Sequence, residues 1–162
     1  MGDKLFAGLS YEEAINQYKR TVASVCLMRL KNHADAEDCF QNTFFKLYRN
    51  SSDFESQEHL KAWLIRVAIN ECNKLLRKSK RLLPLTYSDK ETISFPYDKC
   101  DISWALLMLD LKYRQVLFLY YVEDYEVSQI AQILDKNENT VKSLLRRGRE
   151  KLKNIYGGES YE

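Results

Sequence analysis

The sequence of 162 residues is poor in the two residues that interrupt helices, with five Gly and two Pro. Together with an apolar content of 45%, this scarcity favours a globular and mostly helical protein. The four cysteines and two histidines form no CxxC pair and no zinc-ligand spacing, so we expect no metal site. Most of the cysteines fall within apolar helical patterns, and we interpret them as buried side chains in a reducing cytosol.

The sequence also lacks a long apolar run. The apolar stretch near Leu27 and Leu30 is interrupted by Arg29 and Lys31, so neither a signal segment nor a membrane-spanning segment is expected, and we predict a cytoplasmic protein. No pair of carboxylates is accompanied by a His, a Cys or a Gly-rich loop that completes a catalytic site. We therefore predict a protein that is not an enzyme and needs no cofactor.

The periodicity of apolar residues is helical almost throughout and predicts an all-α fold. Ser10 and Glu13 have the spacing of a capping box at the start of the first helix. Residues 81–101 contain both prolines and no sustained helical period, which is typical of a linker. We predict two small helical domains, residues 1–80 and 102–162, joined by this linker. Before the last two helices, the predicted helices span residues 11–31, 35–48, 60–78, 102–109 and 114–122.

The most informative segment is Tyr125–Lys153, in which a short apolar helix, a polar turn and a basic amphipathic helix follow one another. Ala131 is small where the two helices of a helix-turn-helix cross, and Asp135 occupies the turn. Val141 has the spacing to pack the second helix onto the core, and Asn137 can cap that helix. The segment predicts a helix-turn-helix in the C-terminal domain.

The second helix of this motif is predicted to contact DNA. Its first turns carry polar groups that can read base edges, and its later turns carry cations that can reach phosphates. A solvated basic helix is the alternative, and charge alone favours it, but the added turn spacing favours DNA binding. Because the net charge is only +2, a nucleic-acid surface must come from local clustering of Lys and Arg. The predicted contacts are Asn139, Thr140, Lys142, Ser143, Arg146, Arg147, Arg149 and Lys151.

Taken together, these residues resemble the extracytoplasmic-function group of bacterial RNA polymerase sigma factors, from about Tyr11 to Lys153. Asp35–Arg49 is similar to the helix of that family that binds core polymerase, and His59–Asn70 is similar to its promoter-melting segment. Residues 114–117, 129–134 and 140–143 resemble its C-terminal reader. Three motifs in the right order, separated by a linker of the right size, are more specific than any one alone.

The resemblance implies a non-catalytic subunit that binds core RNA polymerase and promoter DNA. The implied polymerase contacts are Asp35, Asp38, Gln41, Asn42 and Phe45. The N-terminal domain is expected to recognise and open the minus-ten element, and the C-terminal helix to read the minus-thirty-five element. The implied DNA contacts of the N-terminal domain are Phe54, His59, Arg66, Asn70, Lys74 and Arg77. An anti-sigma factor, which can be membrane-anchored, is a further implied partner.

Four positions depart from the residues usual in that family: Asn42, Asp135, Leu144 and Gly148. Leu144 replaces a common Arg and removes one expected DNA contact. Gly148 replaces a common Ala, which predicts a recognition helix weaker by about 1 kcal/mol.

We interpret Phe44 and Trp63 as core residues on the basis of their helical spacing.

Two other hypotheses fit parts of the sequence. A free-standing regulator that dimerises on an operator would use the same helix-turn-helix and would bind DNA tightly without polymerase. A helical adaptor would use its basic faces to contact acidic proteins. The sigma-factor hypothesis differs from both because it predicts little specific DNA binding until core polymerase is added.

Overall fold

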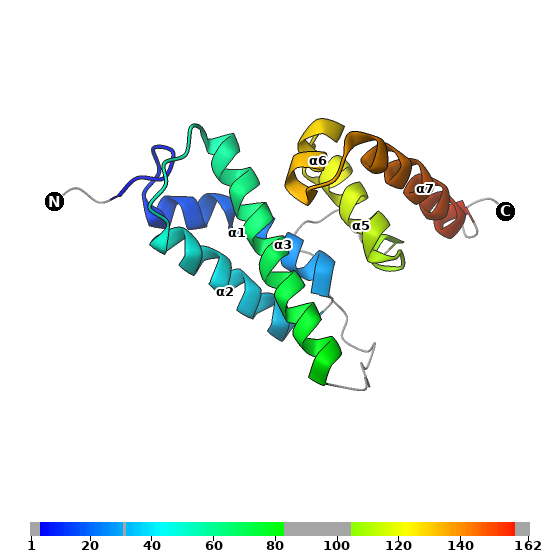
Figure 1. The fold of residues 1–162 in the computed structure, drawn as a ribbon, viewed down its shortest axis with the longest axis horizontal. Coiled ribbons are helices and arrows are strands. Elements are labelled where there is room, and N and C mark those ends of the chain that lie inside the picture. Colours follow the sequence, from blue (N-terminus) through cyan, green and yellow to red (C-terminus); the bar gives the residue numbers. More distant parts are fainter. Residues whose placement is uncertain (1–3, 31, 83–104, 158–162) are drawn as a thin grey trace. The chain divides into compact units, whose positions relative to one another are not determined.

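The computed structural model describes residues 4–30, 32–82 and 105–157, and these are helical over most of their length (Figure 1). The chain divides into two compact units, one containing the helices up to residue 82 and the other those from residue 105 onward. Within the described residues, extended pairing is limited to one isolated bridge between Phe6 and Leu9. The structure confirms the all-α prediction.

The first unit consists, over its described residues, of α1 (Tyr11–Leu30), α2 (His33–Arg49) and α3 (Gln57–Leu82), each of which contacts the other two (Figure 1). Apolar side chains from all three helices meet in the middle, as expected when each helix buries one stripe. The most completely buried of them include Val22, Val25, Met28, Leu47, Leu60, Leu64 and Ile65.

Side-chain caps fix where these helices begin. The Ser10 hydroxyl accepts from the Glu13 amide at 3.1 Å and the Glu13 carboxylate accepts from the Ser10 amide at 3.1 Å, which confirms the predicted capping box. Ser56 accepts from the His59 amide at 3.0 Å, so α3 begins at Gln57, three residues earlier than predicted. The same helix continues through Leu82, two residues into the predicted linker, and residues 83–101 lie outside the described residues.

A tight turn precedes α1. The amides and carbonyls of Phe6 and Leu9 bond reciprocally, at 2.7 and 3.0 Å, around Ala7 and Gly8. Both central residues have positive φ, 51° at Ala7 and 83° at Gly8, as a two-residue turn of this kind requires. The turn inserts the buried Phe6 side chain into the first unit, so the fold of this unit begins before its first helix.

Three of the four cysteines, Cys26, Cys39 and Cys72, are free thiols in the core of the first unit. The pKa of Cys39 is raised by its hydrogen bond with Cys72 and by burial, and the pKa of Cys72 is raised by its hydrogen bond with Cys26 and by burial. Burial of these three side chains was predicted and is confirmed. Cys100 lies outside the described residues.

The second unit contains helical residues 105–107, α5 (Leu111–Leu117), the π-helical turn η1 (Phe118–Val122), α6 (Val127–Leu134) and α7 (Glu138–Gly157) (Figure 1). The predicted helix 114–122 therefore begins three residues earlier and ends as a π-helix. The long helix α7 packs on both α5 and α6. Within the described ranges, no helix is long and apolar enough to cross a membrane.

Gly148 lies where α7 packs against α5. A Cβ atom at this position would lie 3.0 Å from Leu117 Cδ1 and 3.4 Å from Tyr113 Cβ. The prediction from helix propensity alone was incomplete, because the missing side chain also allows close approach of the two helices. Replacement by the Ala usual in the family requires Leu117 to shift as well as stiffening the backbone.

Candidate nucleic-acid and polymerase-binding surfaces

The turn between α6 and α7 has the geometry predicted for a helix-turn-helix. Asp135 adopts the left-handed conformation, with φ 54° and ψ 52°, and ends α6. The Asn137 side chain accepts from the Thr140 amide at 2.8 Å and so caps α7. Ala131 and Val141 are both buried, which places the small residue and the packing residue as predicted.

One side of α7 packs on the rest of the unit and the other is exposed. Val141, Leu145 and Gly148 form the buried side, at spacings of four and three residues. At about 100° per residue, most of the predicted DNA contacts point away from it. Asn139, Thr140, Lys142, Arg146 and Arg147 are exposed, and Ser143 is half-buried.

Arg149 and Lys151 lie at the flanks of this exposed side and contact tyrosines of the same unit. Arg149 Nε donates to the Tyr121 hydroxyl at 2.6 Å, and its guanidinium lies 5.4 Å from the centre of the Tyr120 ring. Lys151 Nζ lies 5.5 Å from the centre of the Tyr113 ring. These cation–π contacts orient side chains that were predicted to reach DNA, and the tyrosines that hold them were not predicted from the sequence.

The residues predicted to bind polymerase form a continuous stripe on α2, opposite its buried side. Asp38, Gln41, Asn42 and Phe45 are exposed and Asp35 is half-buried. Phe45 is 56% exposed and has the Arg49 guanidinium 5.6 Å from its ring centre. The exposed Tyr48 lies one turn further along the same helix and was not among the predicted contacts. Two neighbouring exposed aromatics form an apolar feature suited to a protein partner.

A cluster of three aromatic rings joins the loop between α2 and α3 to the start of α3. Phe54 lies in the loop, and His59 and Trp63 lie in α3. The Phe54 ring lies 5.3 Å from that of His59 and 5.4 Å from that of Trp63, both in edge-to-face geometry. His59 Nδ1 accepts from the Glu55 amide at 3.1 Å, which ties the loop to the start of α3. Phe44 is buried as predicted, whereas Trp63 is half-buried and supports the loop.

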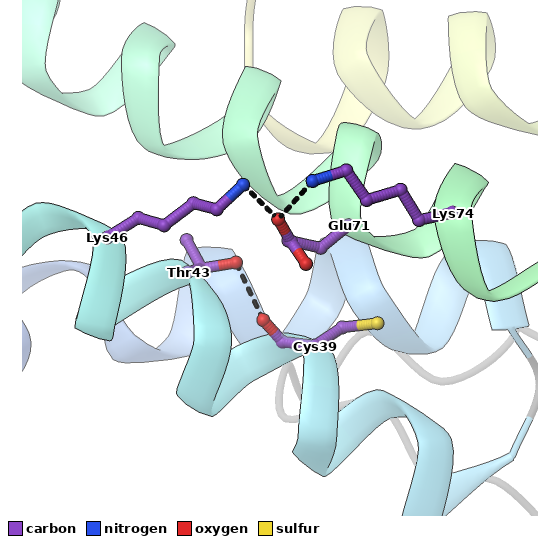
Figure 2. Close-up of polar contacts among 5 residues, drawn as sticks. All are labelled: Cys39, Thr43, Lys46, Glu71 and Lys74. Atoms are coloured by element: carbon purple, nitrogen blue, oxygen red, sulfur yellow. Dashed lines mark hydrogen bonds and ion pairs between the residues drawn. The ribbon is translucent and has the colours of Figure 1, made fainter.

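The predicted DNA contacts on α3 form a second stripe. Arg66, Asn70, Lys74 and Arg77 are exposed and recur every three or four residues, so they lie along one face of the helix. Lys74 Nζ also lies 3.4 Å from the carboxylate of Glu71. Glu71 forms a second ion pair with Lys46 of α2 (Figure 2).

Glu71 is nearly buried between the two helices. Burial alone would raise the pKa of its carboxyl group, but hydrogen bonds and charge from Lys46 and Lys74 outweigh burial and lower the pKa overall. Beside it, the Thr43 hydroxyl donates to the Cys39 carbonyl at 2.7 Å within α2 (Figure 2). Neither Lys46 nor Glu71 was singled out in the sequence.

In the part of the chain that the structure describes, no group of three His, Cys, Asp or Glu side chains is arranged to hold a metal ion.

Two family models match the chain at the places where these surfaces lie. Sigma-70 region 2 matches residues 14–82, and sigma-70 region 4 matches residues 102–152. Among curated proteins, the chain is 28% identical to the ECF RNA polymerase sigma factor SigW of Bacillus subtilis, over 89% of this chain and 87% of the relative. It is 29% identical to the RNA polymerase sigma factor SigV of the same organism, over 82% of each.

Solved structures show the same fold. The sigma factor RpoE of Bartonella quintana, in complex with the anti-sigma factor NepR, superposes with a TM-score of 0.71 at 22% identity, over 92% of this chain and 98% of that one. CnrH in complex with the cytosolic domain of CnrY superposes with a TM-score of 0.67 at 20% identity, over 93% and 89% of the two chains.

The two matched regions, in this order, make the chain a member of the sigma-70 family of bacterial RNA polymerase subunits. Within that family it belongs to the extracytoplasmic-function group. The resemblance seen in the sequence is thereby confirmed.

Proposed function

We propose that this protein is an alternative sigma factor that binds core RNA polymerase and directs it to promoters through two DNA-binding surfaces. The observation that carries the proposal is the coexistence, in one chain with both sigma-70 regions, of the exposed α2 stripe and the outward face of α7. The protein acts by binding and positioning, with no chemical step of its own. Its proposed site of action is the cytoplasm, together with the polymerase.

The α2 stripe is the proposed polymerase contact. Asp35 and Asp38 supply negative charge, Gln41 and Asn42 supply hydrogen-bonding groups, and Phe45 supplies an exposed aromatic anchor. Interfaces commonly combine an aromatic centre with a polar rim, because the aromatic side chain gains most from leaving water. The stripe lies on the side of α2 opposite its buried residues, so a partner can bind it without disturbing the core.

The aromatic cluster at the start of α3 and the stripe along α3 are the proposed minus-ten contacts. The exposed His59 contacts the Phe54 ring and lies, by helical spacing, on the same face of α3 as Arg66, Asn70, Lys74 and Arg77. Aromatic rings next to cations suit single-stranded DNA, because bases stack on the rings while phosphates pair with the cations. Capture of an extruded base offsets part of the unstacking energy of promoter opening.

The exposed face of α7 is the proposed minus-thirty-five contact. Asn139, Thr140, Lys142 and Ser143 stand at the start of the helix, where a recognition helix meets base edges. Arg146 and Arg147 follow within reach of phosphates, with Arg149 and Lys151 at the flanks. Two readers bound to the same polymerase gain affinity for a promoter whose elements have the matching separation.

Control by an anti-sigma factor is part of the proposal. Two solved structures with the same fold are complexes. RpoE is bound to the anti-sigma factor NepR, and CnrH is bound to the cytosolic domain of CnrY. The exposed Phe45 and Tyr48 are available to a competing protein as well as to polymerase. Such competition would keep the sigma factor inactive until the inhibitor is removed.

Reconstitution with bacterial core polymerase tests the function. We expect promoter-specific initiation on genomic fragments only when both are present, and little specific DNA binding by the free chain. Phe45→Ala is expected to weaken core binding about tenfold, because loss of an interface anchor costs about 1–2 kcal/mol. Leu5→Ala is the matched control, since Leu5 is equally exposed at 58% but lies outside the stripe. Tight specific DNA binding by a dimer without polymerase would instead indicate a free-standing regulator.

A further inference from the structure

Glu71 joins two lysines from different helices. Its Oε1 atom contacts Lys46 Nζ of α2 and lies 3.4 Å from Lys74 Nζ of α3 (Figure 2). The Glu71 side chain is only 9% exposed, whereas those of Lys46 and Lys74 are 45% and 58% exposed. The carboxylate is therefore an internal anchor, and both ammonium groups reach the surface beside each other.

The charges of this cluster do not balance. A nearly buried carboxylate requires a counter-charge, and one lysine supplies it. The second lysine leaves an excess positive charge, which a purely structural ion pair does not need. Each ammonium group has three N–H donors, and those not directed at Glu71 remain able to donate to an anion outside the protein.

The cluster adjoins the proposed DNA-binding stripe of α3. Lys74 is a member of this stripe, together with Asn70 one turn before it and Arg77 one turn after it. Through Glu71, Lys46 lies beside the stripe although it belongs to α2. A phosphodiester, with its single negative charge and two free oxygens, is the anion that the backbone of promoter DNA presents to such a row of cations.

We propose that Lys46 and Lys74 together bind the phosphate backbone of promoter DNA, with Glu71 as the positioning residue that holds them side by side. The proposal rests on the proposed function, and it adds Lys46 to the DNA-binding surface. It also gives α2 two roles, because this helix contacts polymerase through its exposed stripe and DNA through Lys46. Binding of the two partners is thereby linked within one helix.

The test measures promoter binding by the holoenzyme, assembled from core polymerase and the full chain, over a range of salt concentrations. Lys46→Gln is expected to lower affinity several-fold and to reduce the slope of log Kobs against log salt by about 0.7–0.9, the value for one lost phosphate contact. Lys74→Gln is expected to do the same, and the double variant to reduce the slope by about twice as much. Lys46→Arg, which keeps the charge, is expected to retain the wild-type slope.

Lys19→Gln is the matched control, because Lys19 is an exposed lysine on α1 outside the proposed surface. It removes the same charge and is expected to leave the slope unchanged. Thermal unfolding of each free variant separates loss of DNA contact from loss of fold. A Lys46→Gln variant that melts earlier but keeps the wild-type slope would show that the ion pair is structural and would overturn the proposal. Absence of promoter binding by the wild-type holoenzyme would overturn the proposed function, and this inference with it.

Discussion

The basic side chains of the proposed DNA-binding surfaces are held differently in the two units of this sigma factor. In the first unit, Lys46 and Lys74 contact the nearly buried carboxylate of Glu71. In the second, Arg149 and Lys151 contact tyrosine rings. A carboxylate cancels part of the positive charge that it holds, whereas an aromatic ring orients a cation and leaves its charge intact.

The two units therefore differ in whether a basic side chain is only held in position or is also partly neutralised. The first unit holds its lysines at the cost of one unit of positive charge and of dependence on the ionisation of Glu71. The second unit keeps the full charge of its basic helix, and its cations depend on the packing of α7 against the segment that carries the tyrosines. Changes to Glu71 should therefore affect the first unit alone, and changes to the packing of α7 should affect the second unit alone.

The largest effect is expected from Glu71→Ala. Removal of the shared carboxylate leaves two lysines without their counter-charge and empties a nearly buried position, but the half-exposed lysines can turn to water. We expect the free energy of unfolding of the first unit to fall by about 2–3 kcal/mol, below the range for a fully buried pair. Hydrogen exchange of amides in α2 and α3 measures the change. The exposed Glu55 supplies a control, Glu55→Ala, which should change little.

A somewhat smaller loss is expected from Gly148→Leu in the second unit. The new side chain collides with Leu117 and Tyr113, so α7 must move away from α5. Overpacking of this kind costs about 2 kcal/mol, and it should also separate Lys151 from the Tyr113 ring. Amide exchange in α5 and α7 reports the loss. Asn154→Leu places the same side chain at an exposed position of α7, and equal destabilisation by that variant would contradict the packing argument.

A smaller effect is expected from acid, which should distinguish the two kinds of anchoring. Because the pKa of Glu71 is lowered in the folded protein, its stabilising contribution is present above its ordinary pKa of 4.5 and is lost as pH falls through the folded value. The stability of the wild-type first unit should therefore decrease below pH 4.5 more steeply than that of Glu71→Gln. Parallel pH profiles for the two proteins, measured by denaturant unfolding, would rule out this linkage.

The smallest effect is expected from Tyr121→Phe. The change removes the hydroxyl that accepts from Arg149 and keeps the ring. At this exposed position we expect a loss of about 0.5 kcal/mol in the second unit, observable as a small shift in its thermal unfolding. Tyr120→Phe is the control, because the contact of Tyr120 with Arg149 is through the ring. A larger loss of stability for Tyr120→Phe than for Tyr121→Phe would mean that the hydrogen bond is not the main interaction that holds Arg149.

Features set by near neighbours in the chain were predictable from the sequence. The Ser10–Glu13 capping box and the Asn137 cap each involve residues three positions apart, and both are present as predicted. The burial of Ala131 and Val141 follows from the spacing of the helix-turn-helix. In each case local chemistry permits few alternatives, so the pattern alone determines the outcome.

Contacts between distant parts of the chain were not predictable in the same way. Arg149 and Tyr121 are 28 residues apart, and Lys46 and Glu71 meet only because α2 and α3 pack together. Which exposed cation meets such a partner depends on the angle at which two helices cross. That angle cannot be predicted from a single sequence. The prediction for Gly148 was incomplete for the same reason, since helix propensity takes no account of a neighbouring helix.

The π-helical turn η1 makes the length of this segment a determinant of side-chain direction. Its wider loop, closed by the Glu123 amide on the Phe118 carbonyl at 3.2 Å, accommodates one residue more than an α-helical turn would. Deletion of a single residue between Phe118 and Val122 would let the backbone relax to an α-helix. The change in direction would be confined to this short segment, because the π-helical turn takes up the extra residue. The loss of one codon would still turn Tyr120 and Tyr121 relative to Arg149.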